Sequence, residues 1–316
     1  MTRAQFEANR DGTTQRILEG GNMISRKHIA GTVFTHGMAA LALWSMLLQA
    51  PTALGEQDPG GRSFVVFDGT LYKDKPDLSA YGIRPISLAY AGALGNTWHR
   101  TPDQMPDKNQ VGKVAREART KADHVVIDIE HWPLHGDSRE VERSVQKFLA
   151  VLDWFKEAAP GLNIGFYGAP PIRDYWRALK GPASKERGVW KHENDALHAL
   201  ADAVDTLYPS LYTFYSDQEG WVRFAQAQIE EARRYGKGKP VYVFLWPQYH
   251  DSNRSLAGTY LPADYWRLEL ETARQYADGI ILWGGWGSNN RPAKWDDDAA
   301  WWKVTREFIQ TVNAHP

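Results

Sequence analysis

The sequence contains no cysteine among its 316 residues. This absence excludes a disulfide framework, a thiolate metal site and a thiol nucleophile. Runs of Lys and Arg are also lacking and the formal net charge is −1, which argues against general nucleic-acid binding. No Gly-x-Gly-x-x-Gly segment or phosphate loop follows the first strand-like run, so we expect no nucleotide cofactor. His131 and His135 are four apart, but Pro133 lies between them and no helix supports a metal site. We therefore expect no metal, and we expect no other cofactor.

Aromatic residues are abundant by contrast. The chain has 14 Trp, 14 Tyr and 11 Phe, whereas average usage predicts roughly 4 Trp in this length. Many Trp residues stand beside Gly, Pro, Asn or charged residues, including Trp98, Trp132, Trp246, Trp283 and Trp286. Aromatic rings can simply fill a core, but a flat apolar ring with a polar edge also suits the face of a sugar.

Residues 1–55 have the pattern of a targeting region. Arg26 and Lys27 form a basic start, residues 38–48 form a short apolar core, and small residues before Glu56 offer a cleavage site. The apolar core is too short to span a membrane comfortably. We therefore expect a secreted or periplasmic protein, with an uncleaved membrane anchor as the alternative.

The start and extent of the mature chain follow from the same region. Residues 1–22 are polar and atypical for the start of a signal peptide, which makes Met23 a candidate for the true start. Loss of residues 1–55 removes five basic and three acidic side chains and leaves a formal net charge of −3. Residues 56–316 contain no low-complexity linker, and their length suits a single barrel-sized catalytic domain.

Apolar strand-like runs alternate with amphipathic helical stretches along this domain. We expect strands at 63–68, 85–90, 124–130, 163–167, 206–212, 241–246 and 279–283. Asp137 and Glu140 are placed like a capping box before one helical pattern, and Gly236 is placed as the stop of another. This alternation predicts an α/β fold, a (β/α) TIM-like barrel of seven or eight strands.

Two acidic residues stand at the end of the most apolar predicted strand. Asp128 and Glu130 are two positions apart, so they share a face at the C-terminal end, where α/β barrels keep their active sites. Two like charges this close raise the proton affinity of at least one of them. A carboxylic acid that stays protonated is what a glycosidase uses to protonate a leaving oxygen. The triplet also arises by chance, since the Asp-x-Glu at 217–219 looks like a helix cap.

The ends of the other predicted strands are rich in Tyr and Trp. Tyr167 and Tyr212 close two of them, and we expect both in a sugar-binding cleft around the acid pair. The candidates for direct substrate contact are Trp283, Trp132, Trp246, Trp286, Asp68 and Tyr249. For Asp68, capping or an ion pair is the plainer explanation of an acid at a strand end.

Four motifs resemble the hyaluronidase family of glycoside hydrolases, in the same order as in that family. Residues 128–132 resemble its Asp-x-Glu-x-Trp motif, and residues 165–168 resemble its Gly-Phe-Tyr-Gly strand. Residues 207–212 resemble its Leu-Tyr-Pro-Ser-x-Tyr segment, and residues 279–283 resemble its Gly-x-x-x-Trp strand. The region before about residue 100 shows no residue-by-residue match.

The resemblance implies a distorted (β/α) barrel and a retaining, substrate-assisted mechanism on an N-acetylhexosamine-containing polysaccharide. By that analogy Glu130 is the general acid and then the base, while Asp128 orients the N-acetyl group whose carbonyl oxygen attacks the anomeric carbon. Tyr167 and Tyr212 would hydrogen-bond the acetamido group or the pair, and Trp283 would form a wall of the acetamido pocket.

The sequence also departs from the family pattern. Pro133 follows Trp132 directly where the family has an Arg that helps to hold the acidic polymer, and Gly-Gly-Trp at 284–286 replaces a Ser-rich segment. The candidates for a basic lining are His99, Arg100, Arg173, Arg291 and Lys294. The alternatives are a glycosidase of the same fold on another cell-wall or exopolysaccharide glycan, or a non-catalytic carbohydrate-binding protein. The glycan, the linkage, endo or exo action and the oligomeric state stay open.

Overall fold

The computed structural model describes residues 63–95, 101, 103–287 and 291–314. The predicted targeting region therefore lies outside the described residues, as do Trp98, His99 and Arg100. Within the described part no helix is both long and apolar enough to cross a membrane.

The described chain is an α/β structure built on parallel strands. The strands are β1 (Val65–Thr70), β2 (Arg84–Pro85), β3 (Ser87–Tyr90), β4 (His124–Asp128), β5 (Asn163–Phe166), β6 (Tyr242–Leu245) and β7 (Gly279–Gly284). They form two parallel ladders, in the orders β2-β1-β7-β6 and β3-β4-β5. Six of the seven predicted strands are thus confirmed, with ends that differ by one or two residues.

The strand pairings close into a ring. β7 pairs with β1 on one side and with β6 on the other. Ile86 alone separates β2 from β3, so this one segment pairs first with β1 and then with β4. Residues 206–213 bridge the gap between β5 and β6, through Tyr167 on the β5 side and through Val241 and Phe244 on the β6 side. The described residues therefore make a seven-membered barrel, as predicted.

The predicted strand at 206–212 is the irregular member of the ring. It forms single backbone bridges instead of a continuous ladder, because Pro209 in its middle has no N–H to donate. Gly165 on β5 lets this segment come close, since a Cβ there would lie 2.2 Å from the Thr206 carbonyl oxygen. The distortion of the barrel is concentrated at this junction.

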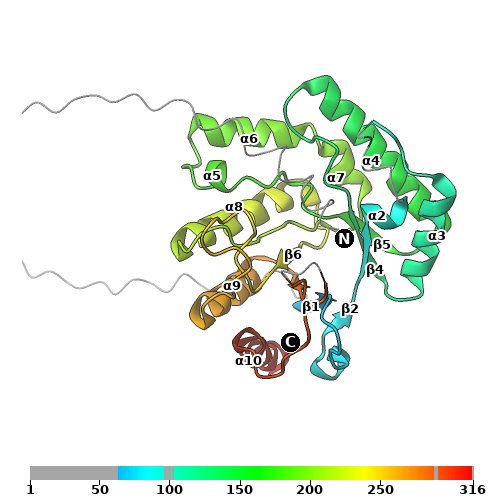
Figure 1. The fold of residues 1–316 in the computed structure, drawn as a ribbon. Helices are drawn as coiled ribbons and strands as arrows, with labels where there is room; N and C mark the ends of the chain where they lie inside the picture. Colours follow the sequence, from blue (N-terminus) through cyan, green and yellow to red (C-terminus); the bar gives the residue numbers. More distant parts are fainter. Residues whose placement is uncertain (1–62, 96–100, 102, 288–290, 315–316) are drawn as a thin grey trace, which may run out of the picture.

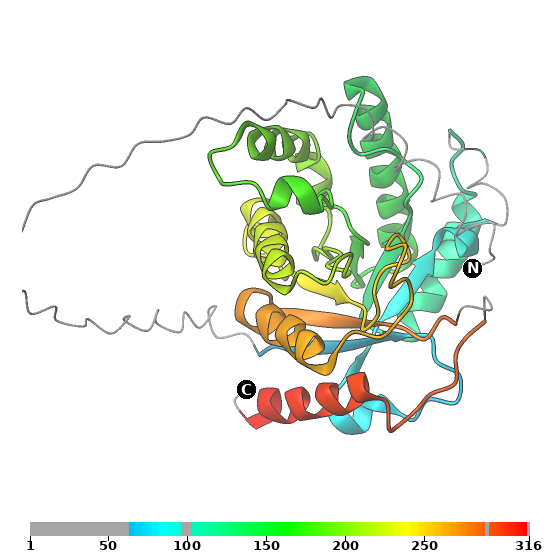
Figure 2. The same cartoon turned by 60° about the vertical axis from the view of Figure 1, so that its left-hand side comes forward.

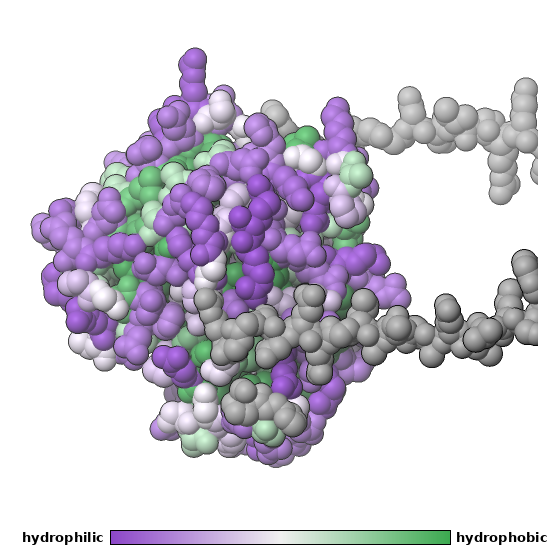
Figure 3. Space-filling model, turned by 180° about the vertical axis from the view of Figure 1, so that it is seen from behind, coloured by the Kyte–Doolittle hydropathy of each residue, from purple (hydrophilic) through white to green (hydrophobic). Residues whose placement is uncertain are grey.

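Helices cover the outside of the strands (Figure 1). They are η1 (Leu78–Tyr81), α2 (Ala91–Leu94), α3 (Lys108–Arg119), α4 (Ser138–Ala158), α5 (Tyr175–Ala178), α6 (Lys185–Asp195), α7 (His198–Ala203), α8 (Gln218–Gly236), α9 (Ala263–Tyr276) and α10 (Ala300–Ala314). Neighbouring helices pack against each other, α3 on α4, α8 on α9 and α9 on α10, and Figure 2 shows the strands enclosed between them. The surface seen in Figure 3 is mostly hydrophilic, with smaller hydrophobic areas between the polar side chains.

The helix ends follow the sequence signals with one difference. Asp137 caps α4 by accepting hydrogen bonds from the backbone N–H groups of Arg139 and Glu140. Asp217 caps α8 in the same way, as its own triplet predicted. Gly236 lies inside α8, and the left-handed residue that ends the helix is Lys237, with φ of 48°.

The strands lie between two hydrophobic cores, an outer core under the helices and an interior core inside the ring. On β4, Val125 and Ile127 face the helices and belong to the large outer core. Val126 faces the barrel interior, because successive side chains on a strand point to opposite faces. The buried residues of the interior core come from every side of the ring and are Phe67, Val126, Tyr208, Tyr212, Tyr242, Phe244, Trp246 and Ile281. This alternation decides which strand-end residues can reach the interior.

Candidate active site

The two carboxylates at the end of β4 share the interior face of the barrel. Asp128 is the last residue of β4, and Glu130 follows two positions later. Both continue the side that Val126 occupies in the interior core. Asp128 is half-buried and Glu130 is exposed. The pair therefore lies at the C-terminal opening of the barrel, as the spacing predicted.

The surroundings of the pair raise the pKa of both acids. Removal from water raises the pKa of Asp128 well above its ordinary value, the Glu130 charge raises it further, and the Arg173 guanidinium opposes both. Desolvation by the surrounding protein atoms raises the pKa of Glu130, and the positive charge of Arg173 lowers it by a smaller amount. The side chain of Glu130 nevertheless keeps contact with solvent. Glu130 is therefore a reachable acid among protein atoms, as a general acid must be.

Three tyrosines stand close to the carboxylates. The rings of Tyr167 and Tyr212 lie 5.8 Å apart, and Tyr90 at the end of β3 is paired in register with Asp128. Burial is the main cause that raises the pKa of all three hydroxyls. They therefore stay protonated and can donate hydrogen bonds. Tyr90 was not among the predicted site residues, although it is the last residue of the predicted strand at 85–90.

Two tryptophans form one wall of the site. The Trp283 ring stacks on Tyr212 at 5.5 Å, and its Nε1 donates a hydrogen bond of 3.0 Å to the Tyr90 hydroxyl. Trp246 meets Trp283 edge-on at 4.9 Å and donates from its Nε1 to Gln248 Oε1 at 2.9 Å. Trp246 is only 5% exposed, so it supports the wall from behind. Trp283 is half-buried and offers its remaining surface to the interior.

Arg173 brings a positive charge into the site. Its Nη1 donates to Ser210 Oγ at 3.2 Å and to the Tyr167 hydroxyl at 3.4 Å, and these two hydroxyls lie 2.9 Å apart. Burial works against the charged guanidinium, but Tyr167 and Glu130 raise the pKa of Arg173 overall. The guanidinium also lies 5.5 Å from the centre of the Phe214 ring. The sequence named Arg173 as one of five candidates for a basic lining, with a plain surface charge as the alternative.

His250 is a neutral neighbour of the same site. Its ring lies 6.2 Å from Tyr212 and 4.8 Å from Phe214. Burial, with a contribution from Arg173, lowers the pKa of His250 to about 3. It is therefore uncharged at any ordinary pH and adds no second cation. No sequence motif marked this residue, because it reaches the site from a loop after β6.

Four of the predicted substrate contacts lie elsewhere. Asp68 lies on the same side of β1 as Val66, which belongs to the outer core. Its carboxylate forms an ion pair of 2.6 Å with Lys75 Nζ. Trp132 is 2% exposed and packs on Phe148 at 5.0 Å. The other two are in loops, Tyr249 as a buried core residue and Trp286 as a half-buried residue whose backbone pairs with Pro292. A direct substrate contact by any of the four stays a prediction.

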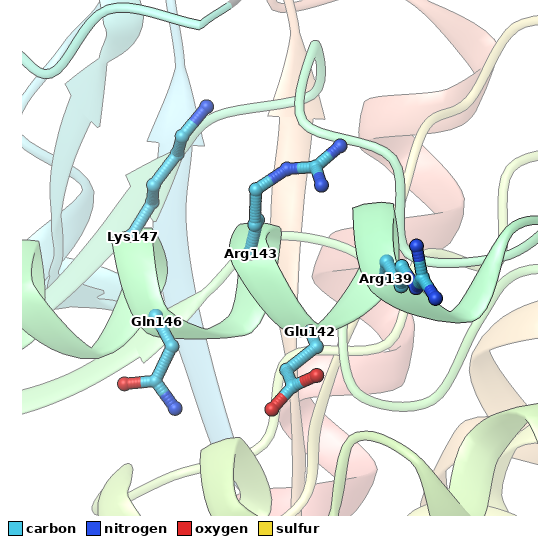
Figure 4. Close-up of a pocket in the computed structure, with 5 residues that line it drawn as sticks. All are labelled: Arg139, Glu142, Arg143, Gln146 and Lys147. Carbon is cyan, nitrogen blue, oxygen red and sulfur yellow. The ribbon is translucent and has the colours of Figure 1, made fainter.

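A hollow on the outer side of α4 is separate from the acid pair. It has a volume of about 430 Å³ and is lined by Arg139, Glu142, Arg143, Gln146 and Lys147. Glu142 and Gln146 extend to one side of the helix, and Arg143 and Lys147 extend to the other (Figure 4). This pattern is typical of a solvated helix surface. No cluster of three or more His, Asp or Glu that could hold a metal ion occurs in the described residues.

Comparison with known proteins adds a structural likeness. No protein-family model matches the sequence, and no curated protein matches it either. Bee venom hyaluronidase in complex with a hyaluronic acid tetramer superposes with a TM-score of 0.54 at 17% identity, over 79% of this chain and 96% of that chain. A monoclinic crystal structure of bee venom hyaluronidase gives a TM-score of 0.51 at 17% identity, over 79% and 97%. At this identity the likeness establishes the fold, a TIM-type α/β barrel.

Proposed function

We propose that this protein is a glycoside hydrolase that cleaves a polysaccharide containing N-acetylhexosamine, with retention and with help from the substrate. The observation that carries the proposal is the pairing of Asp128 with Glu130 on the interior face of β4, beside Tyr167 and Tyr212. A protein that only binds sugars has no need for a reachable acid with a raised pKa.

In the first step Glu130 acts as the general acid. It gives its proton to the glycosidic oxygen while the carbonyl oxygen of the substrate's acetamido group attacks the anomeric carbon. The bond from the anomeric carbon to the leaving oxygen breaks, and its electrons stay on that oxygen. Asp128 beside Glu130 orients the acetamido group, and its ionised carboxylate stabilises the positive charge that develops there. The Arg173 guanidinium favours this ionised form against burial.

In the second step the roles reverse. Glu130, now ionised, takes a proton from a water molecule, whose oxygen attacks the anomeric carbon from the side that the leaving group has vacated. The bond between the anomeric carbon and the acetamido oxygen breaks. The two inversions together retain the configuration, and Glu130 regains its proton.

The position of the two acids favours this route, since Asp128 ends β4 and Glu130 follows two positions later, with Ile129 between them in the outer core. Residues two apart on a strand share a face with Cα atoms roughly 6.5 Å apart. Asp128 and Glu130 therefore approach the sugar from one side, whereas an enzyme nucleophile must stand opposite the acid. A nucleophile from the substrate removes that requirement.

The charge of the substrate is a separate part of the proposal. Pro133 stands where the family has an Arg after the Trp, which favours the alternative of a different glycan. Arg173 supplies a cation from another loop and raises the local positive potential beside Glu130. Arg291 and Lys294 are exposed further out. An acidic polymer such as hyaluronan or chondroitin is therefore retained among the substrates to test.

Export is likewise a proposal. The basic start and the short apolar core within residues 1–55 support a cleaved signal peptide. N-terminal sequencing of the protein from the extracellular or periplasmic fraction tests it. A start near Glu56 is expected, and a chain that keeps residues 23–55 in a membrane fraction would contradict cleavage.

The reaction is tested with a reducing-end assay on hyaluronan, unsulfated chondroitin, partly N-acetylated chitosan and a fully deacetylated chitosan. The full chain is compared with Glu130→Gln, which keeps the shape of the side chain and removes the acid. We expect cleavage of an N-acetylated polymer only, reduced roughly 100- to 10,000-fold in the variant while binding persists. Cleavage of the deacetylated polymer would exclude the acetamido nucleophile, and equal turnover by Glu130→Gln would exclude the assignment of the acid.

A further inference from the structure

Two aromatic side chains are exposed next to each other on the described surface. Trp176 on α5 is 57% exposed and Tyr215 is 38% exposed. Their ring centres lie 5.1 Å apart at an angle of 47°. The described residues include only four large hydrophobic side chains this exposed, the other two being Val189 and Tyr260. Single exposed apolar residues need no explanation, but a pair in contact does.

The pair rests on a rigid base. The buried Tyr175 ring lies edge-on to Trp176 at 5.3 Å and contacts Tyr215 at 5.0 Å. Asp174 caps the short helix α5 and pairs with Arg177 at 2.6 Å, and Arg177 also pairs with Glu193 at 2.6 Å. These contacts hold the turn that carries Trp176, so little order has to be gained when a ligand binds.

The backbone around Tyr215 is fixed from the other side. The Tyr265 hydroxyl donates a hydrogen bond of 3.1 Å to the carbonyl oxygen of Tyr215. Neither the Trp176 indole N–H nor the Tyr215 hydroxyl bonds to another described residue, so both polar groups are available to a ligand. An apolar ring face with a polar edge is the surface that a sugar ring fits.

A continuous series of rings connects this pair to the catalytic tyrosine. The distance between ring centres is 6.2 Å from Tyr212 to His250, 4.8 Å from His250 to Phe214 and 6.4 Å from Phe214 to Tyr215. Trp176, on the short helix α5, follows β5, and Tyr215 follows the segment 206–213, so both come after the C-terminal ends of members of the ring, as the acid pair does. The exposed pair is therefore an outward extension of the site.

We propose that Trp176 and Tyr215 form an outer sugar-binding subsite, on which one sugar ring of a polysaccharide stacks while another sugar of the same chain occupies the acid pair. The inference rests on the proposed function and deepens it. A chain held at two places along its length gains affinity only when it is long enough to reach both. Arg173 and Phe214 line the path between the two positions.

Kinetics on substrates of different length test the subsite. Trp176→Ala and Tyr215→Ala are compared with the full wild-type chain on hyaluronan, unsulfated chondroitin and partly N-acetylated chitosan, each as polymer and as oligosaccharides of increasing length. For the polymer that the wild type cleaves, we expect KM to rise about tenfold with kcat unchanged. The shortest oligosaccharide that is cleaved should show no change, because it does not reach the outer position.

Two matched variants separate the subsite from a general loss of structure. Val189→Ala truncates an apolar side chain that is 44% exposed on α6 and that contacts neither ring of the pair in any ring contact described, and it should leave KM unchanged. Trp176→Phe keeps a ring and should recover most of the affinity for the polymer. An equal loss on short and long substrates, or a loss that Trp176→Phe does not recover, would overturn the inference.

A binding measurement distinguishes failure of the subsite from failure of the proposed function. Calorimetry with the inactive Glu130→Gln chain, with and without Trp176→Ala, measures affinity for the same oligosaccharides. We expect affinity to rise in one step at the length that reaches Trp176, and the step to vanish in the double variant. If the wild type cleaves the polymer and Trp176→Ala matches it, the subsite is wrong and the proposed function stands. If the wild type neither cleaves nor binds any of the three polymers, the proposed function fails and the subsite fails with it.

Discussion

Asp68 and Asp128 both stand near the C-terminal ends of parallel strands, yet they face opposite sides of the barrel wall. Asp128 follows the interior side of β4, where Glu130, Tyr167 and Arg173 act on it. Asp68 follows the outer side of β1, where it pairs with Lys75 and accepts two hydrogen bonds from Thr70. The difference arises because successive side chains on a strand alternate between the two faces. Asp68 lies on the side of Val66, in the outer core, and Asp128 on the side of Val126, in the interior core.

The comparison shows that position along a strand is insufficient to define a site. Burial next to a second acid raises the pKa of Asp128, whereas Asp68 has a cation at 2.6 Å and a local role in the fold. Substitution of each aspartate by asparagine should therefore separate activity from stability.

The largest effect is expected for Asp128→Asn. The change keeps the shape of the side chain and removes the charge that orients the acetamido group, so kcat should fall roughly 100- to 1,000-fold. The melting temperature should change little or rise, because an acid with a raised pKa is removed from its buried setting. Steady-state kinetics and thermal unfolding measure the two effects. Full activity of Asp128→Asn would exclude the substrate-assisted mechanism.

A second effect concerns the cation that acts on the interior pair. Arg173 lowers the pKa of Glu130 and of Asp128 against the effect of burial. In Arg173→Met both pKa values should rise, so both limbs of the pH–rate profile should move to higher pH, with a roughly tenfold lower kcat from the lost hydrogen bonds to Tyr167 and Ser210. Arg173→Lys keeps the charge and should keep the limbs in place. An unchanged profile in Arg173→Met would show that its charge does not reach the pair.

A fully buried acid outside the interior sharpens the comparison. Glu269 on α9 is fully buried, bonds Thr213 through one oxygen, and has no partner for the other among the described residues. Burial raises its pKa well above 4.5. Its contribution to stability is fully present below the unfolded pKa and is lost as pH rises through the folded pKa.

Glu269→Gln should therefore flatten part of the decline in stability with rising pH. Above the folded pKa the variant should melt about 2–4 °C higher than the wild type, the shift that roughly 1 kcal/mol produces in a domain of this size. Below the unfolded pKa the two should agree closely. Thermal unfolding from pH 4 to pH 9 measures this. Parallel curves for the two proteins would show that Glu269 does not titrate in this range.

The smallest effect on activity is expected for Asp68→Asn, the matched counterpart of Asp128→Asn. The loss of a half-buried ion pair and of its hydrogen bonds to Thr70 should lower stability by about 1 kcal/mol. The ratio kcat/KM should stay within about twofold of the wild type, since the side chain faces away from the interior. A loss of activity as large as that of Asp128→Asn would remove the distinction between the two faces.

The sequence predicted the parts of the molecule that local pattern controls. Apolar runs identified six strands, acidic caps at Asp137 and Asp217 identified two helix starts, and the spacing of Asp128 and Glu130 indicated their shared face. The α/β barrel followed from the alternation of these elements. The irregular member at 206–212 was expected as an ordinary strand, although Pro209 in its middle already indicates an interrupted ladder.

The parts that local pattern leaves open depend on tertiary structure. Arg173 and His250 enter the site from loops, and only the folded chain shows that they lie near Glu130 and Tyr212. Trp132 was expected at the substrate because it follows the acid pair, but its ring packs on Phe148 in the outer core. The alternation that separates Asp68 from Asp128 was visible in the sequence. The path of the chain beyond Asp128, where β4 ends and Trp132 turns into the outer core, was not.

The pairing of β1 with β7 also determines when the barrel can form. Val65 is the register partner of Gly279, which lies 214 positions later in the chain. Until β7 has been synthesised, β1 has an unpaired edge on that side, which is a site for wrong association. Contacts between such distant segments raise the contact order and slow folding. A chain truncated before β7 should therefore aggregate instead of forming a smaller stable barrel, because the first strand of the ring depends on the last.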